Sequence, residues 1–101
     1  MEAHNATQKF STETVAAAAV RHAADCIEEL KEKGEPMGTR QTYRRGYNAG
    51  DEWLCNGGLS GDALDEALDH FGNVAALACK HDISGEDAAE FYRNQADVLE
   101  A

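Results

Sequence analysis

The feature that most constrains this fold is a chain of helix-forming residues interrupted by one proline in 101 positions. Alanine, the strongest helix former, occurs 18 times, against 7 leucines, 4 valines and 2 isoleucines. It loses no side-chain entropy in a helix and buries no polar group. Alanine also contributes little apolar area, so the core depends on a few larger side chains. The composition therefore predicts an all-α fold.

Four helical segments are predicted, at about residues 12–33, 39–55, 61–80 and 85–99. In the first segment, apolar residues recur at steps of three and four, which places them on one face of a helix. Gly34 and then Pro36 end that segment in the order that helices prefer. Because short connections favour antiparallel neighbours, we expect residues 11–101 to form a single domain, a compact bundle of four helices. Residues 1–10 are polar and are expected to form a loose, flexible N-terminal tail.

Three serines are predicted to cap these helices. Ser11 precedes the first segment, while Ser60 and Ser84 lie in the similar motifs Leu-Ser-Gly-Asp (59–62) and Ile-Ser-Gly-Glu (83–86). A serine hydroxyl at this position accepts hydrogen bonds from free N–H groups of the first turn. The acidic residue that follows faces the positive end of the helix dipole. Because the sequences after the two motifs diverge, the motifs indicate convergent capping rather than an internal repeat.

The net charge of −10 arises entirely from the second half of the chain. Residues 1–50 carry seven acidic and seven basic side chains, whereas residues 51–101 carry twelve acidic and two basic ones. Such asymmetry raises the potential over one surface and favours association with basic partners. The alternative is that these charges only keep the protein in solution.

Carboxylates recur on the polar faces of the third and fourth predicted helices. If these helices pack side by side, the carboxylates form one negative surface, which arginines bind much as they bind phosphate. The predicted partner-binding residues are Asp62, Asp65, Glu66, Asp69, Glu86, Glu90 and Asp97. The competing interpretation is the solvated exterior of a bundle.

These observations predict a non-enzymatic inhibitor or regulator that binds a basic, nucleic-acid-handling protein or complex. Its size and charge suit a phage protein directed against bacterial defence, of the anti-CRISPR-like or DNA-mimic class. No motif for nucleophilic catalysis or phosphate binding is present. No membrane contact is expected, because no apolar run approaches the ~20 residues of a membrane span. The polar N-terminus lacks a signal-peptide pattern, so a cytoplasmic location is expected.

Histidine and cysteine spacing does not favour a metal site. His22 and Cys26 are four residues apart, but CxxC, HxxxH and HExxH patterns are missing from the sequence. Cysteine is among the most buried residue types, so Cys26, Cys55 and Cys79 are interpreted as core thiols. Neither a metal nor another cofactor is expected.

A short basic and aromatic segment in the second predicted helix supports an alternative, a small regulator that binds nucleic acid directly. Its residues are Arg40, Tyr43, Arg44 and Arg45, followed by Tyr47. Duplex DNA carries one negative charge per ~1.7 Å of its axis, which repels a protein of charge −10. The competing interpretation is that the arginines pair with acidic residues of the first helix while the tyrosines pack in the core.

A second alternative is a homo-oligomeric structural or accessory protein. Gly46 and Gly50 lie one turn apart in the second predicted helix, where each costs ~0.5–1 kcal/mol relative to alanine. The absence of their Cβ atoms is predicted to let another helix pack closely. This glycine edge, or the small-residue face of the first helix, would supply the interface between copies.

Overall fold

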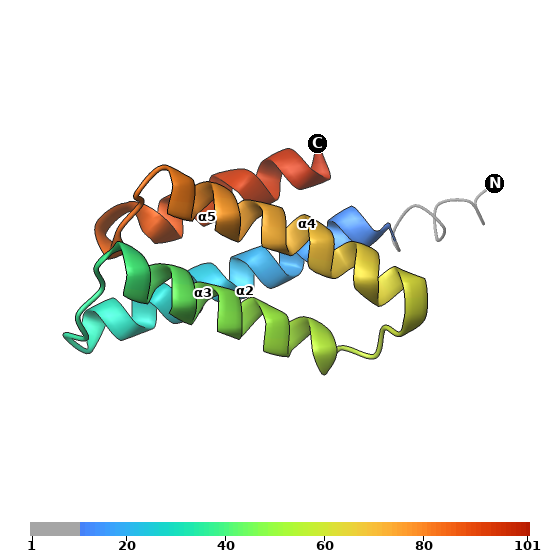
Figure 1. Ribbon diagram of the computed structural model, residues 1–101, viewed down its shortest axis with the longest axis horizontal. Helices are drawn as coiled ribbons and strands as arrows, with labels where there is room; N and C mark the ends of the chain where they lie inside the picture. The colour runs from blue at the N-terminus through green and yellow to red at the C-terminus, as the bar shows by residue number, and fades with distance from the viewer. Residues whose placement is uncertain (1–10) are drawn as a thin grey trace.

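The computed structural model describes residues 11–101, which form four α-helices without any strand. The helices are α2 (Thr12–Glu32), α3 (Thr39–Cys55), α4 (Gly61–Lys80) and α5 (Gly85–Glu100). Each runs antiparallel to the next along the long axis of the bundle (Figure 1). The predicted all-α bundle is confirmed, and each helix boundary lies within one residue of its expected position. The expected tail, residues 1–10, lies outside the described residues.

The central element is α2, which packs against each of the other three helices. Its inward face consists largely of small side chains that are fully buried: Ala16, Ala17, Ala19, Ala23 and Ala24. Small residues at a contact let helix axes approach toward the short end of the usual ~8–10 Å range. The most intimate of these contacts is with α5, whereas α4 and α5 touch each other little. The larger core side chains include Ile27, Leu54, Phe71 and Tyr92.

The two glycines of α3 lie where side chains from other helices meet its backbone. The ring of Phe71 covers Gly50, and a Cβ atom at Gly46 would lie 2.9 Å from the ring and hydroxyl of Tyr92. The predicted close approach is therefore confirmed. The glycine edge of α3 and the alanine face of α2 are both buried within the bundle itself. A homo-oligomer would therefore have to use another surface.

The three predicted serine caps behave differently. The Ser11 hydroxyl accepts a hydrogen bond from the Thr14 N–H at 3.2 Å, as expected. Ser60 and Ser84 occupy N-cap positions, but within the described chain their hydroxyls make no capping hydrogen bond, so that part of the prediction is wrong. Gly61, directly after Ser60, adopts a left-handed conformation with φ +62° at the first position of α4.

At Ser84, two of the first-turn donors already have main-chain acceptors. The Gly85 N–H donates to the Met37 carbonyl and the Asp87 N–H to the Ser84 carbonyl, both at 3.0 Å. The Thr39 hydroxyl also donates to the Asp82 carbonyl at 3.3 Å. These bonds attach the α4–α5 connection to the segment that begins α3, at one end of the bundle.

Candidate functional site

The seven acidic residues predicted to bind a partner are all exposed, but they do not form one surface. Asp62, Asp65 and Asp69 occupy the first half of α4, whereas Glu86 and Glu90 occupy the first turns of α5. Because the two helices are antiparallel, these groups lie toward opposite ends of the bundle (Figure 1). The prediction of one continuous acidic surface across both helices is therefore wrong. The reason is that α5 packs chiefly on α2 and makes little contact with α4.

Two of the seven carboxylates are bound within the protein. Glu66 accepts a hydrogen bond from the Thr12 hydroxyl of α2. Asp97 lies 2.8 Å from a guanidinium nitrogen of Arg21, which also contacts Glu100 at 2.5 Å. Hydrogen bonds to Asp97 and Glu100 raise the pKa of Arg21. Glu66 and Asp97 thus link α2 to its neighbours.

A second arginine neutralises carboxylates across the α2–α5 contact. Arg93 lies 3.0 Å from Glu28 and 2.7 Å from Asp25, and hydrogen bonds to these two groups raise the pKa of Arg93. Exposed pairs of this kind contribute only ~0–1 kcal/mol each to stability. Their main consequence is the distribution of charge, because they neutralise carboxylates of α2 and α5 but not those of α4.

The acidic surface of α4, defined as Asp62, Asp65 and Asp69, is one group left uncompensated; Glu86 and Glu90, at the other end of the bundle, also have no ion pair among the described residues. Within residues 11–101, none of these three carboxylates has a cationic side chain within the 4.0 Å distance of an ion pair. They project from one side of the helix at steps of three and four residues. This surface is therefore open to a basic partner.

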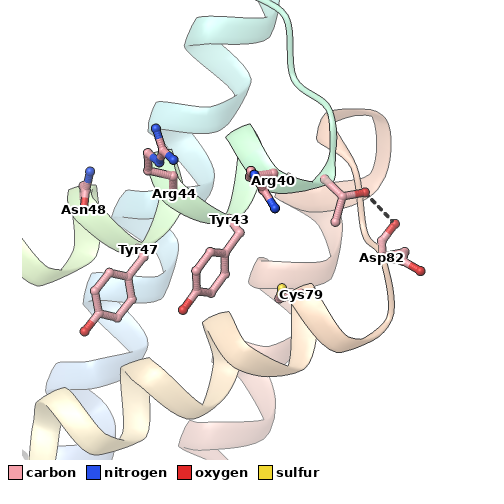
Figure 2. Close-up of a pocket in the computed structure, with 8 residues that line it drawn as sticks. Arg40, Tyr43, Arg44, Tyr47, Asn48, Cys79 and Asp82 are labelled. Carbon is pink, nitrogen blue, oxygen red and sulfur yellow. Dashed lines mark hydrogen bonds between the residues drawn. The ribbon is translucent and has the colours of Figure 1, made fainter.

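The basic and aromatic residues of α3 line a pocket of about 580 Å³, referred to here as the α3 pocket. Its lining residues are Thr39, Arg40, Tyr43, Arg44, Tyr47, Asn48, Cys79 and Asp82. Figure 2 shows that five of the labelled side chains come from α3, while Cys79 and Asp82 approach from the end of α4 and the connection that follows it. The α3 residues recur at three- and four-residue steps, which brings them to one side of the helix.

Three aromatic rings form a column that reaches from the core to this pocket. The centroids of Tyr47 and Phe71 are 6.0 Å apart, and those of Tyr43 and Tyr47 are 5.9 Å apart with an interplanar angle of 18°. Phe71 is fully buried, whereas Tyr47 is 38% exposed. The column ends at Tyr43, on the side where Cys79 lies (Figure 2).

The arginines divide into two groups. Arg45 lies 3.5 Å from Glu35 and does not line the pocket, so the structure separates it from the other members of the predicted nucleic-acid-binding segment. Arg40 and Arg44 are exposed and line the pocket, and no described carboxylate lies within ion-pair distance of either. The competing interpretation, in which the arginines pair with acidic residues of the first helix, does not hold for Arg40 and Arg44, and the partner of Arg45, Glu35, lies after the end of α2.

The three cysteines lie in different surroundings. The Cys26 sulfur lies 3.5 Å from Nε2 of His22, and burial together with nearby carboxylates raises the pKa of the Cys26 thiol, which disfavours the nucleophilic thiolate. Cys55 and Cys79 are exposed near helix ends, so their interpretation as core thiols is wrong. Among the described residues, no cluster of three or more metal-ligating side chains occurs.

Sequence reasoning did not identify four residues of the α3 pocket: Thr39, Asn48, Cys79 and Asp82. The position of Asn48, one turn after Arg44, was available from helical spacing. Cys79 and Asp82 come from a distant part of the chain and carry no such signal.

No helix within residues 11–101 combines the length and apolarity needed to cross a membrane. Comparison with protein-family models, curated proteins and solved structures finds no match.

Proposed function

We propose that the protein is a non-enzymatic, cytoplasmic inhibitor or regulator that binds a basic, nucleic-acid-handling protein through the acidic surface of α4. The observation that carries this proposal is the uncompensated state of Asp62, Asp65 and Asp69, which are exposed and have no cationic partner among the described residues. By contrast, Arg21 and Arg93 neutralise carboxylates between α2 and α5.

The three carboxylates offer a short row of negative charge to a groove that binds phosphates. A helix rises ~1.5 Å per residue, so successive carboxylates are separated by ~4.5 and ~6 Å along the axis. This separation is wider than the ~3.4 Å at which phosphates of one DNA strand recur along the duplex, so the proposed likeness is one of charge and not of exact spacing. Arginine side chains bind carboxylate and phosphate with similar paired hydrogen bonds. The class that we propose is a small phage antagonist of a bacterial defence complex, anti-CRISPR-like or DNA-mimic in type.

The test begins with capture of a partner from nuclease-treated bacterial lysate at low salt, followed by measurement of affinity for the purified partner. Replacing Asp62, Asp65 and Asp69 with Asn removes three charges from α4. The matched control replaces Glu13, Glu29 and Glu32 with Gln, which removes three exposed charges from α2. We expect the α4 variant to bind at least about tenfold more weakly, and the control to bind as the wild type does.

Two further properties of the complex separate electrostatic mimicry from other modes of binding. The wild-type affinity should fall steeply between about 50 and about 500 mM salt, and duplex DNA should compete for the same site on the partner. Affinity that does not change with salt, or equal losses in the two variants, would contradict the proposal. Capture of only further copies of the chain would instead favour a homo-oligomer.

A further inference from the structure

We infer that the α3 pocket binds a free nucleoside phosphate, with its base stacked on Tyr43 and its phosphate held by Arg40 and Arg44. This site is separate from the acidic surface of α4 and does not depend on the function proposed for that surface. It uses the only described arginines that lack a carboxylate partner. Positive groups that remain unpaired beside an aromatic platform, in a protein of charge −10, indicate recognition of an anion with a flat ring.

The aromatic column supplies the platform for the base. Both of its ring pairs have centroid separations of 5.9–6.0 Å, inside the ~4.5–7 Å range of favourable aromatic contacts. Tyr47 is held between Phe71 and Tyr43, and Phe71 is fully buried. The Tyr43 ring is thus oriented before a ligand arrives, and a base stacked on its pocket face would extend the column by one ring.

The two unpaired arginines supply the anion site. Arg40 and Arg44 are one helical turn apart, a rise of ~6 Å, and both line the pocket. In the view of Figure 2, Arg44 extends from the opposite side of the α3 ribbon to the two tyrosine rings. A guanidinium group presents several donors in a planar fork that matches phosphate geometry. A phosphate monoester carries about −1.5 to −2 charges at pH 7, and the two arginines exceed the one carboxylate of the lining, Asp82.

Polar groups lie at the two ends of the pocket (Figure 2), where they can hydrogen-bond different parts of a ligand. The Asn48 amide can both donate and accept hydrogen bonds, and the Asp82 carboxylate can accept them. Asp82 is held in place because its carbonyl accepts the Thr39 hydroxyl at 3.3 Å. The Gly85 N–H to Met37 carbonyl bond of 3.0 Å holds the same two chain segments together. The walls of the pocket are therefore connected without a ligand.

The size and charge of the molecule favour a free nucleotide over a nucleic acid strand. The volume of about 580 Å³ lies within the ~300–1,000 Å³ range of small-molecule pockets. A long polyanion is repelled by the charge of −10 over its whole length. A single nucleotide interacts mainly with its immediate surroundings, where two arginines outnumber one aspartate.

The experiment is calorimetric titration of the full chain with adenosine and guanosine monophosphates. Inorganic phosphate, adenosine without phosphate and a short single-stranded oligodeoxyadenylate serve as comparison probes. A monophosphate should bind at least about tenfold more tightly than phosphate or adenosine alone, because both Tyr43 and the arginines contribute. Arg44→Gln should weaken nucleotide binding at least about tenfold. Arg45→Gln, which removes the neighbouring charge outside the pocket, should leave affinity unchanged.

Tyr43→Leu tests the platform and should weaken nucleotide binding about tenfold, with circular dichroism confirming that the variant folds. If that variant does not fold, the affinities of Arg44→Gln and Arg45→Gln for the nucleotides still test whether the pocket is the binding site. The inference is overturned if neither nucleotide binds at about 1 mM, if the two arginine variants lose affinity equally, or if the oligonucleotide binds more tightly than the nucleotides. Arg44→Gln should retain binding to a partner of the α4 surface, so failure of one proposal is distinguishable from failure of the other.

Discussion

The ring of Phe71 on α4 lies directly over the backbone of Gly50 on α3, so close that a Cβ atom at Gly50 would overlap it. Gly50 therefore sets the distance between two helices, and the same ring begins the aromatic column that ends at Tyr43. One close contact thus positions both the core and the platform of the α3 pocket.

Replacing Gly50 with alanine should lower the free energy of unfolding by about 1–3 kcal/mol, the usual cost of overpacking. This loss should exceed the ~0.5–1 kcal/mol that alanine gains in helix propensity. Gly72→Ala in α4 is the matched control, because no described atom lies within 4 Å of its added Cβ and φ is not left-handed. That variant should be more stable than the wild type by ~0.5–1 kcal/mol. Urea denaturation checks both values, and stabilisation by both variants would show that the contact is not restrictive.

Tyr92→Phe should stabilise the protein. Tyr92 is fully buried, and its hydroxyl has no hydrogen-bond partner among the described residues. Leaving a buried polar group unpaired costs ~1–3 kcal/mol, so removing the hydroxyl should raise the free energy of unfolding by about 1 kcal/mol. Equilibrium denaturation at neutral pH measures the change. A substantial loss of stability would mean that the hydroxyl has a partner.

The same residue should make stability fall at high pH. Burial raises the pKa of Tyr92 to about 12 in the folded protein, whereas an exposed tyrosine has a pKa of ~10. The unfolded chain therefore releases this proton first. The contribution to stability is complete below pH ~10 and is lost as the pH rises to ~12, by about 2–3 kcal/mol. The stability of wild type relative to Tyr92→Phe should decrease over that interval, and a constant difference would refute the assignment.

The serine caps should differ in energetic importance. Only the Ser11 hydroxyl makes a capping hydrogen bond among the three N-cap serines of the described chain. Ser11→Ala should therefore lower the free energy of unfolding by about 1 kcal/mol. Ser60→Ala and Ser84→Ala should each change it by only about 0.3 kcal/mol. Thermal unfolding of the three variants makes the comparison. Equal losses at all three sites would indicate that Ser60 and Ser84 cap their helices in solution.

The acidic surface of α4 should be maintained at some cost in stability. Asp65 and Asp69 are exposed and one turn apart, an arrangement in which like charges destabilise a helix by ~0.2–0.5 kcal/mol. Replacing both with Asn should raise stability by about this amount at low salt, and the gain should disappear near 0.5 M salt, where the screening length is only a few ångströms, about 4 Å. Asp25→Asn, which breaks a pair with Arg93, should not stabilise. A loss of stability in the α4 variant would indicate an attractive partner for those carboxylates.

Local sequence features were sufficient to predict the helices. The spacing of apolar residues, the Ser11 cap and the Gly34–Pro36 stop act within one or two turns, and each lies where the structure begins or ends a helix. The close approach at Gly46 and Gly50 was predictable for a similar reason, since a glycine inside a helix is unfavourable unless something requires the space. The concentration of negative charge in residues 51–101 is also a property of the sequence alone.

The candidate site was only partly predictable. Helical spacing predicted that Arg40, Tyr43 and Arg44 lie close together. It could not show that Glu35 pairs with Arg45, or that Cys79 and Asp82 complete the pocket. The acidic residues also show that contacts between helices could not be predicted from the sequence. Helical spacing grouped the carboxylates of α4 correctly, whereas joining them to those of α5 required a packing arrangement that the protein does not adopt.

The sequence by itself determined the four helices, their boundaries and the sign of the surface charge, because helix formation depends on neighbours three or four residues away. Only the tertiary structure decided which helices touch, since that depends on how faces distant in the chain fit together. Packing α5 onto the alanine face of α2 separated the two acidic groups. It also engaged Arg21 and Arg93 in ion pairs and left Arg40 and Arg44 beside the tyrosines.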